Sequence, residues 1–199
     1  LSAEMIAEKW NMSREEIDQF ALESQQKAAK AWEENRFQKS IVPVKAPVEG
    51  GGLKSVDRDE HFRPQTTIEG LGKLQPSFRP DGRMTAGNSS GIVDGSAAVL
   101  IAGEKAVKDY GLTPRARFVS MTVVWTDPAI MLTGPIPSTQ KALKKAGLKA
   151  GDIDLYEINE AFSVVALACM KELEIPESKV NIRGGAVALG HPIGASGAR

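Results

Sequence analysis

The sequence predicts an α/β protein, with a helix-rich first part followed by a parallel sheet whose strands alternate with helices. In the first 38 residues the apolar side chains recur at helical spacing. From about residue 97 onward, short apolar runs alternate with amphipathic segments in the order strand, helix, strand, helix, strand, helix, strand. This alternation is typical of βαβ units, whose strands lie parallel.

The helix-rich part begins with a strongly helical pattern over residues 1–38. Within it, Ser13 and Glu16 form a capping-box pattern, in which the hydroxyl caps amides at a helix start and the carboxylate reciprocates. Pro43 cannot donate to a strand ladder, so the apolar run around it is interpreted as an edge strand. In order, we then expect an edge strand at 41–44, a glycine turn at 50–52, a surface loop at 53–66 and a short helix at 67–74.

The alternating part is predicted from apolar runs and from the glycines that follow helical patterns. Residues 97–102 are uniformly apolar, which is typical of a strand buried on both faces. Gly111 and Gly147 each follow an amphipathic segment and are expected to end a helix. The predicted strands are 97–102, 117–124, 153–158 and 180–183, and the predicted helices are 104–110, 137–146 and 161–173.

The composition excludes several functional classes. A chain of 199 residues with 42% hydrophobic content can bury the core of one or two domains. A formal net charge of zero argues against a nucleic-acid-binding protein, although a local group of arginines and lysines could still bind an acidic ligand. No apolar run approaches the ~18–20 residues that cross a membrane. The single cysteine, Cys169, forms no internal disulfide and suits a reducing compartment, and with only two histidines the chain cannot build a cysteine-rich metal site.

The first candidate site is Asn159, which follows the predicted strand at 153–158 and precedes an apolar helix. Ligands of open α/β sheets bind beyond the carboxyl ends of the strands, so this position is a candidate for binding or catalysis. Asparagine is also a common N-cap, and capping the following helix would explain the residue equally well.

The second candidate is His191, in the run Gly190-His191-Pro192. Gly190 permits an unusual backbone conformation, and Pro192 suits the first position of a helix. The imidazole would then lie near a positive helix end, where a neutral ring can act as a base or as a hydrogen-bond donor. A histidine satisfied by local hydrogen bonds is the alternative.

A third candidate is the loop at 85–91, which is rich in small and hydroxyl residues. Small residues allow a ligand to approach the backbone closely, but a simple turn between strands would look the same. The chain has no P-loop and no dinucleotide fingerprint. His61 stands in a charged loop and is expected to be solvated or paired within that loop.

Read together and in order, these motifs resemble the thiolase family. The resemblance rests on Thr85-Ala86-Gly87-Asn88-Ser89-Ser90-Gly91 with Asp94-Gly95, on Asn159-Glu160-Ala161-Phe162, and on Gly184-Gly185 followed by Gly190-His191-Pro192-Ile193-Gly194-Ala195-Ser196-Gly197. It covers nearly the whole chain, because residues 63–78 are similar to the family's loop domain and 134–154 to the helix and turn before the Asn-Glu-Ala-Phe motif.

The resemblance implies an incomplete thiolase-like α/β fold: a helix-rich loop domain plus part of a layered α-β-α assembly. On that plan, residues 1–84 are the later part of the loop domain, 85–114 the end of the N-terminal half, and 115–199 the start of the C-terminal half. The chain begins and ends inside helical patterns, so we expect a segment of a longer protein. Family members are usually dimers or tetramers, so a homodimer or homotetramer is expected for the full-length protein.

The resemblance also implies a function, the exchange of acyl groups between coenzyme A thioesters by Claisen condensation or by thiolytic cleavage of a 3-ketoacyl-CoA. His191 would activate a nucleophilic cysteine and help bind the thioester oxygen, and Asn159 would hold a water that completes this oxyanion hole. Ser90 and Ala161 match positions along the pantetheine tunnel. Arg63 matches a residue near the adenine end of coenzyme A, and Phe78 a wall of the same site. Coenzyme A is a substrate here, and no bound cofactor is implied.

The two reactive cysteines of the family are not among these residues. Cys169 follows Val165 by four positions on an apolar helix face, so we expect a buried, inert thiol and no turnover by this segment alone. The alternative function is a non-catalytic acyl-CoA-binding or scaffold protein with the same fold. The expected compartment is the cytoplasm, or an organellar matrix in a eukaryote.

Overall fold

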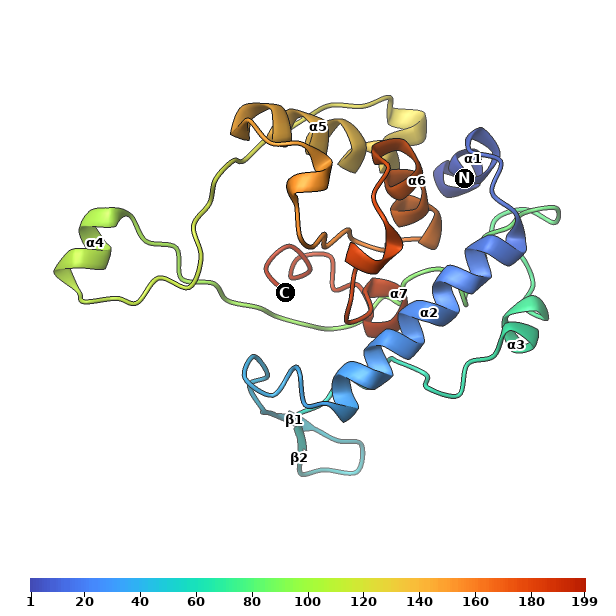
Figure 1. The fold of residues 1–199 in the computed structure, drawn as a ribbon. Helices are drawn as coiled ribbons and strands as arrows, with labels where there is room; N and C mark the ends of the chain where they lie inside the picture. The colour runs from blue at the N-terminus through green and yellow to red at the C-terminus, as the bar shows by residue number, and fades with distance from the viewer.

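The computed structural model describes residues 1–199, and helices form most of its regular structure (Figure 1). None of these helices combines the length and the apolar character needed to span a membrane. In chain order the elements are α1 (Ser2–Lys9), α2 (Arg14–Glu33), β1 (Val44–Pro47), β2 (Leu53–Val56), α3 (Ile68–Gly72), α4 (Glu104–Asp109), the 3-10 helix η1 (Pro128–Thr133), α5 (Pro135–Ala146), η2 (Ala150–Asp152), α6 (Ser163–Leu173), η3 (Glu177–Lys179) and α7 (Ala186–Leu189).

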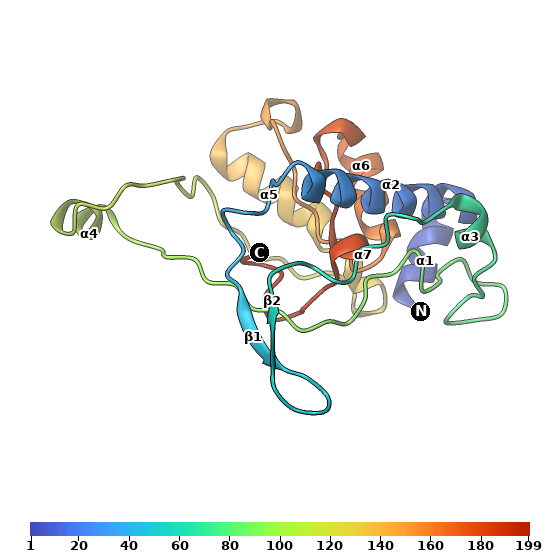
Figure 2. The same ribbon diagram turned by 90° about the horizontal axis from the view of Figure 1, so that it is seen from below.

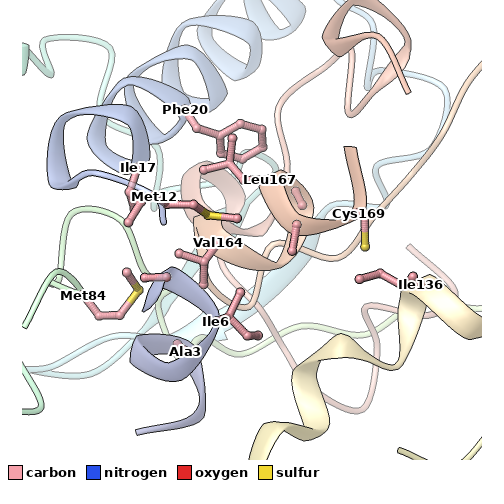
Figure 3. Close-up of a cluster of buried hydrophobic side chains, with 13 residues drawn as sticks. Ala3, Ile6, Met12, Ile17, Phe20, Met84, Ile136, Val164, Leu167 and Cys169 are labelled. Carbon is pink, nitrogen blue, oxygen red and sulfur yellow. The ribbon is translucent and has the colours of Figure 1, made fainter. Parts of the chain in front are cut away.

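Helix α6 is the centre of the packing. Every residue from Ser163 to Cys169 is buried, so this helix is covered on all sides over its first two turns. Its apolar side chains pack against Ile6 of α1, Phe20 of α2 and Ile136 of α5 (Figure 3). A helix that is apolar all round is stable only in such a position, because no face of it favours water.

Two buried carboxylates attach the loop at 83–88 to this core. Glu4 of α1 accepts hydrogen bonds from the backbone N–H groups of Arg83 and Met84, at 2.9 Å each for the shortest contact. Asp18 of α2 accepts one from Asn88 Nδ2 at 2.7 Å. Because a buried carboxylate requires hydrogen-bond donors, these contacts fix the loop's position against both helices.

The predicted helices are confirmed, with small changes at their ends. Ser13 Oγ accepts a hydrogen bond from the backbone N–H of Glu16 at 3.0 Å, as an N-cap does. The reciprocal half of the capping box is wrong, because the Glu16 carboxylate instead forms a 2.8 Å ion pair with Lys171 of α6. Gly147 has the left-handed conformation expected after α5, with a φ of 70°.

The region after α2 forms a hairpin. Strands β1 and β2 pair antiparallel, with Val44 opposite Val56 and Pro47 opposite Leu53. The predicted strand at 41–44 is therefore shifted toward the C-terminus, and the predicted loop at 53–66 begins with a strand. The cause is the turn at 50–52: all three glycines have positive φ, which folds the chain back and gives each short strand a partner.

The predicted parallel strands do not form a ladder within this chain. The segments 97–102 and 117–124 have no strand neighbour. They lead to and from α4, which projects from the body in both views (Figures 1 and 2), and 117–124 returns to α5, where Lys141 Nζ donates to the carbonyl of Val123 at 2.7 Å. The segments 153–158 and 180–183 share one parallel bridge, between Tyr156 and Val180. A strand exists only with a hydrogen-bonded neighbour, and apolar runs alone cannot supply one.

Candidate active site

Asn159 and His191 meet in the structure although 32 residues separate them. Asn159 Nδ2 lies 3.3 Å from His191 Nε2. Asn159 is carried by the segment bridged to Val180, and His191 follows α7. The backbone N–H of His191 donates to the carbonyl of Gly91 at 2.9 Å, which joins the third candidate segment to the pair.

The hydrogen bonds of His191 define its tautomer. Nδ1 lies 2.6 Å from Ser196 Oγ, and that hydroxyl donates to the carbonyl of Pro192 at 3.2 Å. A serine hydroxyl has one proton, so when it donates to Pro192 the proton between Ser196 and Nδ1 belongs to Nδ1, and Nε2 is unprotonated. Nε2 then accepts from the amide of Asn159. In this arrangement the nitrogen that faces Asn159 is the one that can take a proton.

The backbone at Gly190 allows this placement. Gly190 has a φ of 84°, and a Cβ atom there would lie 2.5 Å from Val93 Cγ2. Only glycine fits both the conformation and the close approach. The expected helix after Pro192 is wrong, because residues 192–199 form hydrogen-bonded turns. Contact with Ser196, rather than a helix end, therefore favours a proton on Nδ1.

Ser90 and Ala161 are also brought together. The backbone N–H and the hydroxyl of Ser90 both donate to the carbonyl of Ala161, at 3.1 and 3.0 Å. An antiparallel bridge joins Ser89 to Phe162 beside them. Helix α6 starts after Phe162, so the interpretation of Asn159 as its N-cap is wrong, and the Asn159 side chain can face His191.

Phe78 and Arg63 each make one contact that fixes their place in the structure. Phe78 packs edge-on against Phe162, with ring centroids 5.8 Å apart, and keeps 45% of its surface exposed. The backbone N–H of Arg63 donates to Gln25 Oε1 at 2.7 Å, while its side chain is exposed. These contacts fix the backbone of Arg63 and leave its guanidinium available to a ligand.

His61 is a residue whose place the sequence did not predict. Its ring lies against Gly91, where an added Cβ would be 2.2 Å from a ring carbon. Burial, and to a smaller degree the positive charge of Arg63, lowers the pKa of His61 below its ordinary value. The expectation of a solvated loop residue is therefore wrong. His61 is half-buried and packs against Gly91, whose carbonyl accepts the hydrogen bond from the His191 N–H.

A hollow of about 410 Å³ opens beside Asn159. Burial raises the pKa of Glu157 in its wall, with the charge of Arg183 opposing this effect. The lining residues are Val124, Gly134, Pro135, Ser138, Thr139, Tyr156, Glu157, Ile158 and Asn159. Asn159 therefore lies between this hollow and the imidazole of His191.

Cys169 takes no part in this site. It is 1% exposed and belongs to the core around α6 (Figure 3). Burial raises the pKa of its thiol to about 12, so the reactive thiolate is essentially absent at neutral pH. The expectation of a buried thiol is confirmed.

Ser196 was not singled out from the sequence either. It follows His191 by five positions in Gly-Ala-Ser-Gly, and the signal that could have identified it is a hydroxyl one turn beyond a histidine in a glycine-rich segment. Spacing alone cannot distinguish that hydroxyl from an exposed one, because the turn that directs it at Nδ1 is a tertiary feature.

Comparison with known proteins gives the same family for both parts of the chain. The model of the thiolase N-terminal domain matches residues 1–105, and that of the thiolase C-terminal domain matches 112–199. The 3-ketoacyl-CoA thiolase of Cronobacter sakazakii is 50% identical over an alignment of 203 positions that covers 100% of this chain and 52% of that protein. The chain thus spans about half the length of the curated relatives it matches.

Solved structures agree. The crystal structure of the Bacillus anthracis acetyl-CoA acetyltransferase has a TM-score of 0.96 and 44% identity, covering all of this chain and 50% of that one. The human mitochondrial 3-ketoacyl-CoA thiolase in complex with CoA has a TM-score of 0.90 and 44% identity, covering all of this chain and 49% of that one. The fold is therefore the α/β fold of these structures, and the predicted fold class is confirmed.

Proposed function

We propose that this chain, which belongs to the thiolase family, supplies the histidine side of the active site of a coenzyme-A-dependent acyltransferase. The observation that carries the proposal is the 3.3 Å contact between Asn159 Nδ2 and His191 Nε2. It joins two of the family-like motifs in a single polar site. The named relatives are 3-ketoacyl-CoA thiolases and acetyl-CoA acetyltransferases, and we assign the same reaction class to the protein that contains this chain.

In this reaction a cysteine thiol gives its proton to a base and attacks the carbonyl carbon of a thioester; a new C–S bond forms, the old C–S bond breaks, and the expelled coenzyme A thiolate takes the proton back from the base. His191 suits the role of the base, because Ser196 occupies its Nδ1 and leaves Nε2, on the side of Asn159, to take a proton. Once protonated, Nε2–H becomes a donor that can stabilise the developing oxyanion. Asn159 adds a second donor, directly or through a water.

We assign the substrate path to the residues that lie outward from this pair. Ser90 and Ala161 form a hydrogen-bonded wall next to Asn159, which suits the pantetheine arm. The exposed ring of Phe78 suits contact with the adenine end. The exposed guanidinium of Arg63 suits a phosphate, because arginine binds phosphate oxygens through paired N–H groups.

The nucleophile must come from residues other than these 199, because Cys169 is the only cysteine and is buried. We therefore propose that the chain alone does not turn over. Within the protein that contains it, we assign 1–84 to the loop domain, 85–114 to the N-terminal half and 115–199 to the C-terminal half. We further propose a homodimer or homotetramer, in the cytoplasm or an organellar matrix. A non-catalytic acyl-CoA-binding protein is not favoured, since the named relatives are enzymes.

The test is a chimera in which these residues replace the aligned part of the Cronobacter sakazakii thiolase, so that the relative supplies the rest of the enzyme. The substrate is a 3-ketoacyl-CoA with free CoA, and the measured quantity is the rate of acyl-CoA formation. We expect turnover by the chimera, and a loss of roughly 10²–10³-fold in kcat for His191→Ala and for Asn159→Ala, because each removes a preorganised polar group. Gln19→Ala, on the exposed face of α2, is the control and should retain the activity.

A folded chimera without turnover would contradict the proposed function. So would full activity of His191→Ala, because the reaction would then not use the site described here. The isolated chain, assayed in parallel, is expected to produce no acyl-CoA, and activity that alkylation of Cys169 abolishes would contradict the assignment of the nucleophile.

A further inference from the structure

We propose that Glu160 is a positioning residue of the site, and that its buried carboxylate fixes the distance between Asn159 and His191. Glu160 stands between Asn159 and Ala161 in the sequence, but its side chain points away from both into the interior and is 1% exposed. The proposal rests on the proposed function only in treating Asn159 and His191 as the reacting pair.

The carboxylate joins three separate parts of the chain. Oε2 accepts from Ser24 Oγ of α2 at 2.8 Å and from the backbone N–H of Val187 in α7 at 3.1 Å. Oε1 accepts from Asn181 Nδ2 at 2.7 Å. All three contacts are donors, so they match a carboxylate and not a carboxamide of the same shape.

The contact with Val187 fixes the segment that carries His191. Val187 lies in the four-residue helix α7, and His191 comes two residues after this helix ends. The turn before α7 also approaches the carboxylate: a Cβ at Gly185 would lie 2.3–2.5 Å from its atoms. The backbone N–H of Gly185 donates to Ser24 Oγ at 3.0 Å, so serine, carboxylate and helix start form one connected group.

The contact with Asn181 fixes the segment that carries Asn159. Asn181 Nδ2 also donates to the carbonyl of Ile158 at 2.8 Å, and its Oδ1 accepts the backbone N–H of Ile158 at 2.8 Å. The residue before Asn159 is therefore bonded on both sides to the side chain that holds Glu160. Since Asn159 itself makes no hydrogen bond other than the one to His191, its position depends on this support.

These contacts make a specific prediction for Glu160→Gln. The glutamine amide can accept from Ser24 and Val187, but its N–H then faces the N–H of Asn181; the opposite orientation places its N–H against the backbone N–H of Val187. The side-chain amide of Asn181 cannot flip without losing its two hydrogen bonds to Ile158. Either the segment that carries Asn159 or the segment that carries His191 must therefore move, and the contact between the two side chains lengthens.

The experiment measures the tautomer of His191 in the intact chain, independently of activity. The chain has two histidines, so selective 15N labelling gives two rings, and His61→Gln assigns them. In the unmodified chain we expect the proton of His191 on Nδ1. Asn159→Ala, the positive control, is expected to shift the equilibrium toward the Nε2–H form. Glu160→Gln is expected to produce most of the same shift.

The matched control is Glu4→Gln, because Glu4 is also 1% exposed and accepts backbone N–H bonds, but at the loop 83–84. It should leave the His191 signals unchanged. An unchanged His191 tautomer in folded Glu160→Gln, or an equal change in Glu4→Gln, would overturn the proposal. If Glu160→Gln does not fold, Ser24→Ala decides: it removes one donor, and no shift of His191 in this variant would also overturn the proposal.

Failure of this inference and failure of the proposed function give different results. An inactive chimera in which Glu160→Gln still alters the His191 tautomer contradicts the reaction but not the positioning. An active chimera whose His191 tautomer ignores Glu160 contradicts only the positioning.

Discussion

At the scale of single residues, burial decides which side chains are available for chemistry. Cys169 and His191 are both nucleophilic or basic types, yet one is in the core and the other faces an open site. The thiol at position 169 has no charged neighbour that would stabilise its thiolate, and burial alone raises its pKa to about 12. Chemistry therefore depends on the surroundings that the fold gives each residue.

This contrast predicts how Cys169 reacts. At pH 8, iodoacetamide should alkylate it on the order of 10³-fold more slowly in the folded chain than in urea, because the thiolate fraction falls with the raised pKa. The measurement is the mass of the alkylated product over time, and the assignment is unambiguous because there is one cysteine. Equal rates in both states would contradict a buried thiol.

The same pKa implies a dependence of stability on pH. The pKa of the Cys169 thiol is higher in the folded chain than its value of about 8.5 in the unfolded chain. The protonated thiol therefore contributes fully to the free energy of unfolding below about pH 8.5. This contribution is lost as the pH rises toward about 12, where the buried thiol would have to ionise. Cys169→Ala is expected to remove this part of the decrease in the free energy of unfolding.

At the scale of elements, α2 connects the core to the site. Its apolar face contributes Ile17 and Phe20 to the main core, while Asp18 and Ser24 on the same helix bind Asn88 and Glu160. Because α2 both packs in the core and makes these buried polar contacts, we expect a change in its first turn to affect the segments that carry Asn88 and Glu160.

Ser13→Ala tests this dependence at the start of α2. Loss of the N-cap hydrogen bond to Glu16 is expected to lower the free energy of unfolding by about 1 kcal/mol, measured by urea denaturation. Thr67→Ala is the matched control, because Thr67 caps the five-residue α3, which buries only Leu71. The control should cost less. An equal or larger loss at Thr67 would mean that the start of α2 has no special importance.

At the scale of the whole molecule, one segment of the chain contributes no buried side chain to a hydrophobic core. The segment from about residue 92 to 125, which leads to α4 and back (Figures 1 and 2), carries large apolar side chains. These side chains are exposed. Exposed apolar surface of this extent favours association with other surfaces. The most exposed examples are Ile92, Leu100, Tyr110, Val123 and Trp125.

Hydrogen exchange should show this difference directly. The backbone amides of 97–102 and 117–124 make no hydrogen bond in this structure, so we expect them to exchange early, while those of α2 and α6 are protected. Helix α6 is the internal control, since it is buried in the same sample. Strong protection of 117–124 in a monomeric sample would contradict the structure of this segment.

The sequence by itself predicted the helices, the caps at Ser13 and Gly147, and the family. Ser13, Gly147 and the spacing in α2 are local signals, because a cap or a helical face depends on residues within one or two turns. The motifs around Asn159 and His191 were also visible as sequence, and the structure brings them together.

Only the tertiary structure decided which apolar runs become strands and which polar groups support the site. The runs at 97–102 and 117–124 have the composition of strands, but a ladder requires a neighbour that local sequence does not specify. The tautomer of His191 depends on Ser196, and the carboxylate of Glu160 depends on donors from positions 24, 181 and 187. These contacts join residues that are distant along the chain, so packing, and not local spacing, determines them.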